Sequence, residues 1–396
     1  MALIIWTTII VAIAIYIFHK LLNKKKLPPG PWGLPILGHL HLIGKNPHQD
    51  FYKLAKKYGP FMHLQLGLVP TIVVSSPKTI EKVLKTYDHV FASRPHHEAS
   101  QHVCYGQRNL IFSKYGSYWR NMRKLTTMNL GITSRLKALS KVFDEFLEKI
   151  IDEHVESKEQ KETKDFVDTM MDIMQSGEAG FKFDRCHVKA VLLDMLMTSM
   201  DTSATSVEWI LTELLRHPHV MKKLQKELEQ VVGLDRMVEE SDLENLNYLD
   251  MVIKEALRLH SAAPLLIHES IQDCVVDGFF VQKGSRIIVN VYAAQRDPNA
   301  WPEPDKFLPE RFVESTVDLR GHDFQLLPFS SGRRSCPGMQ LGIIIVRLVV
   351  AQLVHCFDWE LPNGMQPSEL DMSEQFGVVN CRAKHLMAIP TYRLQL

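Results

Sequence analysis

The 396-residue sequence predicts a mainly α-helical fold with small β-sheets, preceded by an N-terminal transmembrane helix. Three observations predict this fold class. Long segments carry apolar side chains at helical spacing, and the longest, 187–216, runs for about 30 residues. The runs 61–66 and 71–75 alternate well enough to predict a two-stranded hairpin. An unbroken apolar run from Ala2 to Phe18 opens the chain.

Charge and cysteine content exclude several classes of protein. The 46 basic and 45 acidic residues leave a net charge of +1, so no global field points to nucleic acid. The 6 cysteines are scattered without Cys-x-x-Cys pairs, which argues against a zinc ribbon and against a disulfide framework. The soluble part therefore belongs in a reducing compartment. Length alone allows one to three domains.

The first 39 residues predict a membrane anchor at 1–20 and a basic, proline-rich hinge at 21–39. The 17 apolar residues are at the short end of what spans a bilayer. No charge precedes this run and no small-residue cleavage site follows it, so it is not a cleaved signal peptide. Lysines follow it at 24–26, so the positive-inside rule leaves the rest of the chain in the cytosol. We therefore expect a single-pass membrane protein.

The hinge contains 4 Pro and 3 Gly within the 12 residues 27–38, so it cannot be a helix or a central strand. Such a composition predicts a semi-rigid spacer. A disordered linker is the alternative. Because Trp, Leu and Ile are interleaved with the prolines, we expect the segment to pack on the globular part.

The next segments predict a short helix, a loop and two longer helices. Ser76-Pro77 supplies an N-cap and a first-turn proline for a helix to about Lys85. Residues 92–118 show no periodicity and predict an irregular loop, whose histidines we interpret as solvated rather than as metal ligands. Residues 135–155 predict a strongly amphipathic helix, and 165–175 a shorter one.

Trp119 and Arg123 are four residues apart, on one face of a predicted helix. An indole N–H and a guanidinium on the same face suit two acceptor oxygens, such as those of a carboxylate group. Taken alone the pair carries little weight, because Trp and Arg are often merely adjacent surface residues.

The long helix 187–216 ends at His217-Pro218 and has an unusual centre. Residues 197–205 are rich in Thr, Ser and Asp, whose side chains compete for backbone hydrogen bonds, so we expect a local break that marks a bend or a working site. Asp201 and Thr202 form an acid–alcohol pair that could relay protons into a buried pocket. The alternative is a polar face turned to water, but the apolar flanks predict a buried helix.

A further helix places Glu255 and Arg258 three residues apart, close enough for an ion pair. By itself this is an everyday surface pair. The runs 262–267 and 284–291 predict strands, and 376–379 forms an apolar tip near the end of the chain.

The loop 329–338 reads Phe-Ser-Ser-Gly-Arg-Arg-Ser-Cys-Pro-Gly and precedes the long apolar helix 339–357. A Cys336 thiolate would lie beside two arginines and among the free N–H groups of a helix start, which favour the ionised form. Such a thiolate is a metal ligand or a nucleophile. A buried structural cysteine is the alternative. It is disfavoured because Gly332, Arg334, Pro337 and Gly338 stand at defined offsets from Cys336.

The pattern Phe-x-x-Gly-x-Arg-x-Cys-x-Gly resembles the haem-binding loop of the cytochromes P450. Five motifs in the same order resemble a plant-type (A-type) microsomal cytochrome P450: the hinge, Trp-x-x-x-Arg, the Asp-Thr helix, Glu-x-x-Arg and the Cys loop. The resemblance covers essentially the whole chain. It implies the cytochrome P450 fold, with a haem-binding catalytic domain at 40–396.

The resemblance also implies roles for individual residues. Cys336 would be the axial ligand of the iron of haem b, in a loop bounded by Phe329 and Gly338. Asp201 and Thr202 would deliver protons to bound dioxygen. The haem propionates would be held by Trp119, Arg123, His268 and Arg334. The scaffold of the haem loop would be held by a buried triad of Glu255, Arg258 and Arg311.

The implied activity is that of a haem-thiolate monooxygenase in the endoplasmic reticulum membrane, with its catalytic domain cytosolic. One oxygen atom of O2 would enter a small apolar, secondary-metabolite-like substrate and the other would become water. Electrons would come from NADPH-cytochrome P450 reductase, docked on the thiolate side. A thiolate ligand pushes electron density toward the iron, which favours O–O cleavage.

The chain departs from the family pattern in several places. Trp119 lies only 82 residues before Asp201, where the family has roughly a hundred more residues, so a segment is apparently deleted near 126–134. The missing part would carry several helices, including much of the lid over the distal face of the haem. Thr198-Ser199 replaces two small residues of the oxygen-binding stretch, and Ile267 stands where a Pro usually precedes His268.

Two alternatives follow from these departures. The chain is a truncated, catalytically inactive, membrane-anchored remnant or splice form that binds haem poorly, or it is a haem-thiolate isomerase or dehydratase that uses no dioxygen. The Asp201-Thr202 pair argues against the second.

Overall fold

The computed structural model describes residues 26–97, 100–101, 106–126, 136–157, 165–177 and 182–395. The predicted anchor at 1–20, the first part of the hinge and the junction at 127–135 lie outside these residues. The domain boundaries therefore stay predictions. Within the described residues the chain is mainly helical with small sheets, as the sequence predicts.

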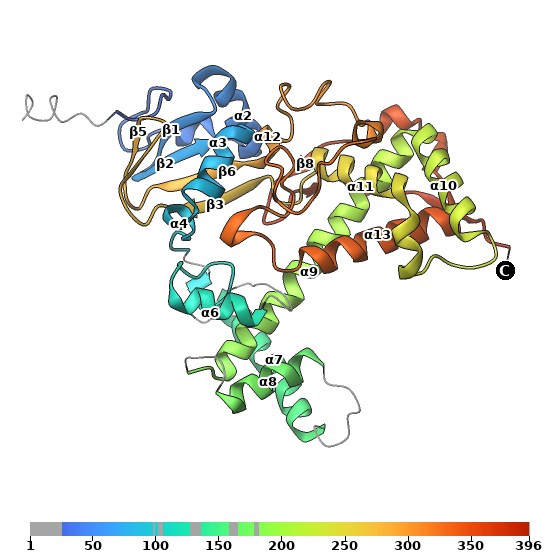
Figure 1. The fold of residues 1–396 in the computed structure, drawn as a ribbon, viewed down its shortest axis with the longest axis horizontal. Coiled ribbons are helices and arrows are strands. Elements are labelled where there is room, and N and C mark those ends of the chain that lie inside the picture. The colour runs from blue at the N-terminus through green and yellow to red at the C-terminus, as the bar shows by residue number, and fades with distance from the viewer. Residues whose placement is uncertain are drawn as a thin grey trace, which may run out of the picture.

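A four-stranded sheet in the order β1-β2-β6-β3 forms one end of the molecule (Figure 1). The predicted hairpin is β1 (Phe61–Leu66) and β2 (Val69–Val74), paired antiparallel. β2 pairs in parallel with β6 (Arg286–Asn290), and β6 pairs antiparallel with β3 (Leu265–Glu269). The sheet therefore joins segments some two hundred residues apart in the chain.

Short helices cover this sheet. Ser76 caps the helix α3, as predicted, and its Oγ accepts a hydrogen bond from the Thr79 amide at 3.4 Å. A π-helical turn, Lys82–Thr86, continues α3. The helices near the sheet are α2 (Pro47–Tyr58), α3 (Pro77–Glu81), α4 (Asp88–Phe91) and α12 (Val291–Ala294).

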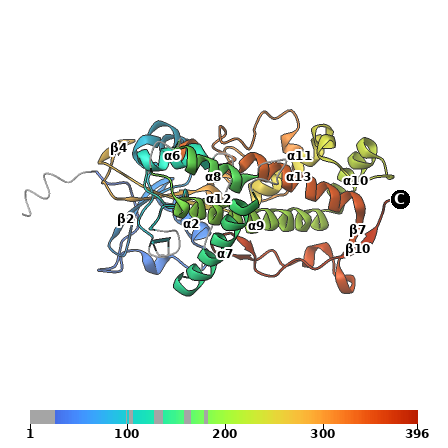
Figure 2. The ribbon, with the colours of Figure 1, turned by 90° about the horizontal axis from the view of Figure 1, so that it is seen from below.

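The helix α9 (Arg185–Arg216, 32 residues) is the axis of the helical part (Figures 1 and 2). Helices α6, α7 and α8 pack with its N-terminal half, and α10, α11 and α13 with its C-terminal half. Their bounds are α6 Ser117–Thr126, α7 Leu136–Ser157, α8 Phe166–Ser176, α10 Pro218–Val232, α11 Asn247–Leu259 and α13 Met339–Cys356. These bounds confirm the helices predicted at 135–155, 165–175, 187–216 and 339–357.

Three two-stranded sheets and several 3-10 turns complete the described structure. The strands are β4 (Cys274–Val276) with β5 (Phe279–Val281), β7 (Phe357–Glu360) with β10 (Ile389–Tyr392), and β8 (Glu374–Gln375) with β9 (Cys381–Arg382). The 3-10 turns are Leu40–Leu42, Glu240–Asn245, Pro309–Phe312, Gly332–Arg334, Pro362–Gly364 and Pro367–Glu369.

By length and composition α13 could cross a bilayer. Its residues Val346, Val350 and Val354 are instead buried in the core that it forms with α9, α10 and α11. This apolar helix is therefore a core helix of the globular part.

The helix predicted at 187–216 is continuous through its Ser- and Thr-rich stretch, so no break of the helix marks this stretch. Thr198, Ser199 and Ser206 donate their hydroxyl hydrogens to carbonyl oxygens four residues earlier, at 3.3, 2.7 and 2.8 Å. The Thr202 hydroxyl does the same to the Thr198 carbonyl. These side chains share the carbonyls of the helix rather than displacing its backbone hydrogen bonds.

The predicted burial of α9 is wrong at its centre. Met200 is 66% exposed, and Leu196 and Asp201 are exposed as well. The core shared with α6–α8 ends near Met195, and the core shared with α10, α11 and α13 begins near Val207. Farther along α9, an apolar groove of about 520 Å³ separates this helix from Ile345 and Val349 of α13. The described structure therefore leaves part of α9 without a covering helix.

The hinge packs on the sheet through its backbone. The His63 amide of β1 donates to the Pro29 carbonyl at 2.8 Å, and the His39 amide donates to the Gln65 carbonyl of β1 at 2.7 Å. The interleaved apolar side chains do not account for this packing, since Trp32 is 94% and Ile36 is 85% exposed. Backbone hydrogen bonds thus hold the hinge against β1.

Glu213 joins the end of α9 to the end of α11. Its Oε1 lies 2.7 Å from Nε2 of His260, and its Oε2 lies 3.2 Å from Nδ1 of His217. Burial raises the pKa of Glu213, but hydrogen bonds from His217 and His260 outweigh it and leave the pKa at about 2. The hydrogen bond to Glu213 raises the pKa of His217 above its ordinary value.

We predict that this cluster stabilises the fold most between about pH 4.5 and 6.5. The Glu213 contribution is present above its ordinary pKa and is lost as the pH falls toward 2. The His217 contribution is present below its ordinary pKa and is lost as the pH rises through the raised value. Glu213→Gln should lower the free energy of unfolding near pH 5.5 by on the order of 3 kcal/mol in denaturant titrations.

The control for this experiment is Glu240→Gln, which changes an exposed carboxylate. Its titration should follow that of the unmodified chain. An unchanged pH profile in Glu213→Gln would contradict the assignment.

Candidate functional site

The Cys336 loop is held in shape by backbone contacts. The Cys336 amide donates to the Phe329 carbonyl at 2.8 Å, and Gly338 is the N-cap of α13. Gly332 has φ +65°, and a Cβ at this position would lie 2.3 Å from the Leu84 carbonyl oxygen. Glycine is therefore required at position 332, both for the left-handed backbone and for the close approach to Leu84.

The surroundings of the Cys336 thiol differ from the sequence prediction. Burial raises the pKa of this thiol, while the Gly338 amide and Arg123 act to lower it. Of the two loop arginines expected to favour the thiolate, Arg333 pairs with Asp88 at 2.6 Å and Arg334 donates to backbone carbonyls. Arg123, rather than Arg333 or Arg334, is therefore the arginine that acts on the sulfur.

Arg334 is buried and donates to three carbonyl oxygens, those of Ala92 at 2.7 Å, Leu110 at 3.0 Å and Ser113 at 2.6 Å. Burial lowers the pKa of Arg334 to about 8, and the neighbouring Arg94 and Arg123 act in the same direction. A guanidinium carries five N–H donors, so these three bonds leave donors over for an acceptor group.

Trp119 and Arg123 lie next to this arginine. The Trp119 indole N–H donates to the Leu110 carbonyl at 2.9 Å, and its ring stacks against the Arg334 guanidinium at 4.1 Å. Arg123 Nη2 lies 3.3 Å from the Ser335 hydroxyl. The indole N–H already has a backbone acceptor here, so its predicted contact with a propionate stays a prediction.

His268 completes this cluster from strand β3. Its Nδ1 donates to the Phe91 carbonyl at 2.9 Å, while its Nε2 is buried without a hydrogen-bond partner. Burial and the charges of Arg94 and Arg334 lower its pKa well below the usual range, so the ring is neutral. A buried nitrogen left without a partner, beside Arg94 and Arg334, is a feature expected where a further polar group binds.

Arg94 is the residue of this cluster that sequence reasoning missed. Its Nε donates to the Ile111 carbonyl at 3.2 Å and its Nη1 to the Ile267 carbonyl. Burial lowers its pKa to about 10. It stands in a loop without periodicity and its acceptors are backbone atoms, so nothing in the pattern of side chains marks it.

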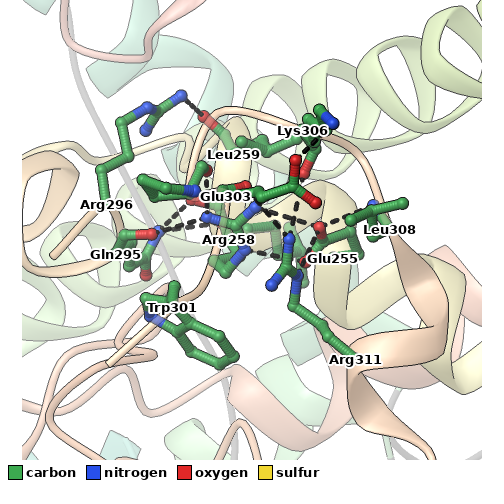
Figure 3. A network of polar contacts seen from close by, with 12 residues as sticks. Glu255, Arg258, Leu259, Gln295, Arg296, Trp301, Glu303, Lys306, Leu308 and Arg311 are labelled. Carbon is green, nitrogen blue, oxygen red and sulfur yellow. Dashed lines mark hydrogen bonds and ion pairs between the residues drawn. The ribbon is translucent and has the colours of Figure 1, made fainter. Parts of the chain in front are cut away.

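The structure brings Glu255, Arg258 and Arg311 together (Figure 3). Glu255 and Arg258 are fully buried, and their carboxylate and guanidinium form two hydrogen bonds at 2.7 and 3.0 Å. Arg311 Nε donates to the same carboxylate at 2.8 Å. The remaining guanidinium donors take backbone carbonyls, among them those of Pro302, Pro304 and Lys306.

This triad is linked to the Cys336 loop through Gln295. Arg258 donates to the Gln295 carbonyl at 2.8 Å, and the Gln295 side-chain amide donates to the Arg258 carbonyl at 2.7 Å. The Gln295 side-chain oxygen accepts from the Leu327 amide at 2.9 Å, two residues before Phe329. The geometry suits a structural role, because every charge is paired inside the protein.

Asp201 and Thr202 are not joined to this cluster. Among the contacts of the described residues, none links either side chain to the Cys336 loop, and the Thr202 hydroxyl bonds within its own helix. Asp201 is exposed. Their role with dioxygen therefore rests on the resemblance alone.

Comparison with known proteins agrees with this geometry. The protein-family model described as cytochrome P450 matches residues 28–133 and 131–387. The chain belongs to the cytochrome P450 family. Cytochrome P450 CYP736A12 of Panax ginseng is 44% identical over 478 aligned positions, which cover 96% of each chain. Germacrene A hydroxylase of Saussurea costus is 34% identical, over 98% of this chain and 99% of that protein.

Solved structures of the family share the fold. A zebrafish cytochrome P450 solved with abiraterone is 26% identical, with a TM-score of 0.79 over 88% of this chain and 100% of that one. The plant relatives place the chain in the A-type class, and the family uses haem b held through a cysteine thiolate. Members of this family are monooxygenases that act on small apolar molecules.

The lengths of these alignments carry further information. The alignment with the Panax ginseng protein has 478 positions but takes in 96% of the 396 residues of this chain, roughly 380, so roughly 98 positions of that relative have no counterpart here. The two stretches that match the family model meet at residues 131–133. This junction lies between α6 and α7.

The residues of the cluster fit the haem of this family. The Gly338 N–H reaches the Cys336 sulfur, which suits a sulfur that carries negative charge. The spare donors of Arg334 suit carboxylate oxygens, and Nε2 of His268 would donate to one once the ring is protonated. Cys336, Arg334, His268, Arg94 and Arg123 would together hold the haem.

We predict that Glu255→Leu lowers the free energy of unfolding by about 3–5 kcal/mol, because it leaves two buried guanidiniums without their carboxylate. Denaturant titration measures the change. The matched control is Lys149→Ala, which removes an exposed pair with Glu153 and should cost less than about 1 kcal/mol. Near-normal stability of Glu255→Leu would contradict the structural role of the triad.

Proposed function

We propose that this chain is a haem-thiolate monooxygenase that inserts one oxygen atom of O2 into a small apolar substrate of the secondary-metabolite class. The observation that carries the proposal is the Cys336 loop, with the Gly338 N–H on the sulfur and the arginine–histidine cluster beside it. Relatives named as hydroxylases of germacrene A and germacrene A acid support the substrate class.

Each residue of the cluster has a distinct part in this proposal. When bound, the haem supplies the oxygen chemistry. Cys336 ligates the iron, and the Gly338 N–H moderates the charge on the sulfur. Arg334, Arg94 and Arg123 offset the charge of the propionates, whose negative charge would favour a protonated His268 with an Nε2–H that donates to a carboxylate oxygen.

Asp201 and Thr202 are proposed to pass protons toward the distal side of the haem. Both are on α9, and Thr202 donates to the carbonyl of Thr198 in the present structure. A relay would require this hydroxyl to turn from the helix toward bound dioxygen. Electrons are proposed to come from NADPH-cytochrome P450 reductase, bound on the thiolate side.

A second candidate is the inactive remnant, and a specific observation favours it. The centre of α9 is exposed at Leu196, Met200 and Asp201, and an apolar groove lies open between α9 and α13. We propose that the segment deleted near 126–134 covers these surfaces in relatives. Without it, water reaches the distal side, and exposed apolar surface costs about 25 cal/mol per Å².

We propose that the chain is anchored in the endoplasmic reticulum membrane by residues 1–20, with its catalytic domain in the cytosol. The exposed apolar side chains of Trp32, Ile36 and Leu68 support a membrane nearby, because Trp favours the bilayer interface. Gly38 bridges to Leu66 at the end of β1, which places the hinge beside the β1–β2 turn that carries Leu68.

A carbon monoxide difference spectrum separates the two candidates. Membranes that contain the chain, reduced under carbon monoxide, should show the strongly red-shifted Soret band of a thiolate-ligated haem. Cys336→Ala should abolish the band, because it removes the iron ligand. A chain with no such band in the unmodified form is the remnant.

An insertion variant tests the cause of a missing band. It carries the corresponding segment of the Panax ginseng relative between residues 126 and 136. If the insertion restores the band, the deletion accounts for the loss; if the band stays absent, the assignment of the Cys336 loop is wrong.

We predict that protease added outside sealed microsomes digests the chain beyond residue 26, while a tag placed before Met1 is protected. This follows from the lysines that lie C-terminal to the apolar run. Immunoblotting for the two ends measures it. Protection of both ends would place the catalytic domain in the lumen and contradict the topology.

A further inference from the structure

Asp194 is a buried carboxyl group that the proposed function does not use. It lies on α9, one turn before Thr198, and is 4% exposed. Its Oδ1 accepts from the Asn109 side-chain amide at 2.9 Å, and its Oδ2 accepts from the Leu110 amide at 2.9 Å. The Ile111 amide also donates to it. All three donors belong to one segment, 109–111, of the loop that precedes α6.

The same loop holds the haem cluster on its other side. The Leu110 carbonyl accepts from both Arg334, at 3.0 Å, and the Trp119 indole, at 2.9 Å. The Ile111 carbonyl accepts from Arg94 at 3.2 Å, and the Ser113 carbonyl accepts from Arg334 at 2.6 Å. The loop thus turns its N–H groups to Asp194 and its carbonyls to the cationic side chains.

One residue connects the two sides directly. The Leu110 N–H donates to Asp194 at 2.9 Å, and the Leu110 carbonyl accepts from Arg334 and Trp119. By holding this N–H, Asp194 fixes the backbone at Leu110 and so the direction in which the Leu110 carbonyl points. Asp194 and Arg334 are therefore coupled through Leu110 without touching each other.

We propose that Asp194 is a positioning residue of the haem site, which holds the Arg334 guanidinium and the Trp119 indole at the Cys336 loop through Leu110. It contacts neither substrate nor haem in this role. It lies on the helix assigned to dioxygen, so it also ties the Cys336 side of the site to α9.

The chemistry of the group agrees with this role. Burial raises the pKa of Asp194 to about 7, while the donors Asn109, Leu110 and Ile111 act to lower it. A carboxyl group is costly at such a position unless each of its acceptors is used. The Oδ1 atom of Asn109 is buried without a partner, so it can accept a proton or an N–H from position 194.

The test compares three variants of the full chain in detergent or lipid discs. Asp194→Leu removes every acceptor at similar volume, whereas Asp194→Asn keeps one acceptor and adds a donor for the free Asn109 oxygen. The control is Ile210→Ala on the same helix, which leaves a cavity in the fully buried core shared with α10 and α11 and touches no residue of 109–113.

Two readouts distinguish positioning from mere stability. In the chain without added haem, hydrogen exchange at the Leu110 and Ile111 amides should accelerate about tenfold or more in Asp194→Leu, since their acceptor is gone. The dissociation constant of added haemin should rise by about tenfold. Asp194→Asn should stay within about threefold of the unmodified chain in both, and Ile210→Ala should lower only the unfolding midpoint.

The proposal would be overturned if Asp194→Leu behaved like Ile210→Ala and left hydrogen exchange at residues 110–111 unchanged. It would also be overturned if Asp194→Asn changed hydrogen exchange and haemin binding as much as Asp194→Leu does. Should Asp194→Leu fail to fold, Asn109→Leu removes one of the three hydrogen bonds and should accelerate the same amides by a few fold. The haemin-binding measurement rests on the proposed function, whereas the hydrogen-exchange measurement does not. A chain that binds no haem but shows the exchange pattern therefore refutes only the proposed function.

Discussion

The carboxylate of Glu255 is the constraint on which the rest of the structure depends. It lies fully buried between two guanidiniums, and such a charge is tolerated only if it is paired and hydrogen-bonded. The donors that it leaves on Arg258 and Arg311 collect backbone carbonyls from 295–306, a stretch without regular structure beyond Ala294. The side-chain oxygen of Gln295 accepts a hydrogen bond from the Leu327 amide, which connects this network to the start of the Cys336 loop. A packed network of charges thereby fixes a loop that has little helix or strand of its own.

Much of the fold follows from the sequence because its signals are local. The hairpin at 61–74, the Ser76 cap and the helices α7, α8, α9 and α13 rest on periodicity and on capping within a few residues. The parallel pairing of β2 with β6 has no such local signal, because its partners are some two hundred residues apart. The Ser- and Thr-rich centre of α9 could not be interpreted from the sequence alone, because hydroxyls that compete with the backbone in principle can share the helical carbonyls instead.

The candidate site divides in the same way. Cys336, Arg334 and the triad stand in motifs with fixed offsets, so their positions could be read from the sequence. Arg94 and Asp194 could not, since both act through backbone groups of loops that lack periodicity. The arginine that acts on the Cys336 sulfur could not be predicted from the sequence, because Arg333 and Arg334 take other partners that only the whole fold brings near them.

The backbone attachment of the hinge has a consequence for how the molecule meets other proteins. The Lys26 carbonyl already accepts from the Phe280 amide of β5 at 2.7 Å, so the body begins at residue 26. With an anchor that ends at residue 20, only five residues remain to connect them, and these reach roughly 18 Å when fully extended. If residues 1–20 form the proposed anchor, the body is confined to a thin layer above the bilayer. An encounter with another anchored protein would then be a search in two dimensions, in which tilt and rotation about the membrane normal replace free tumbling.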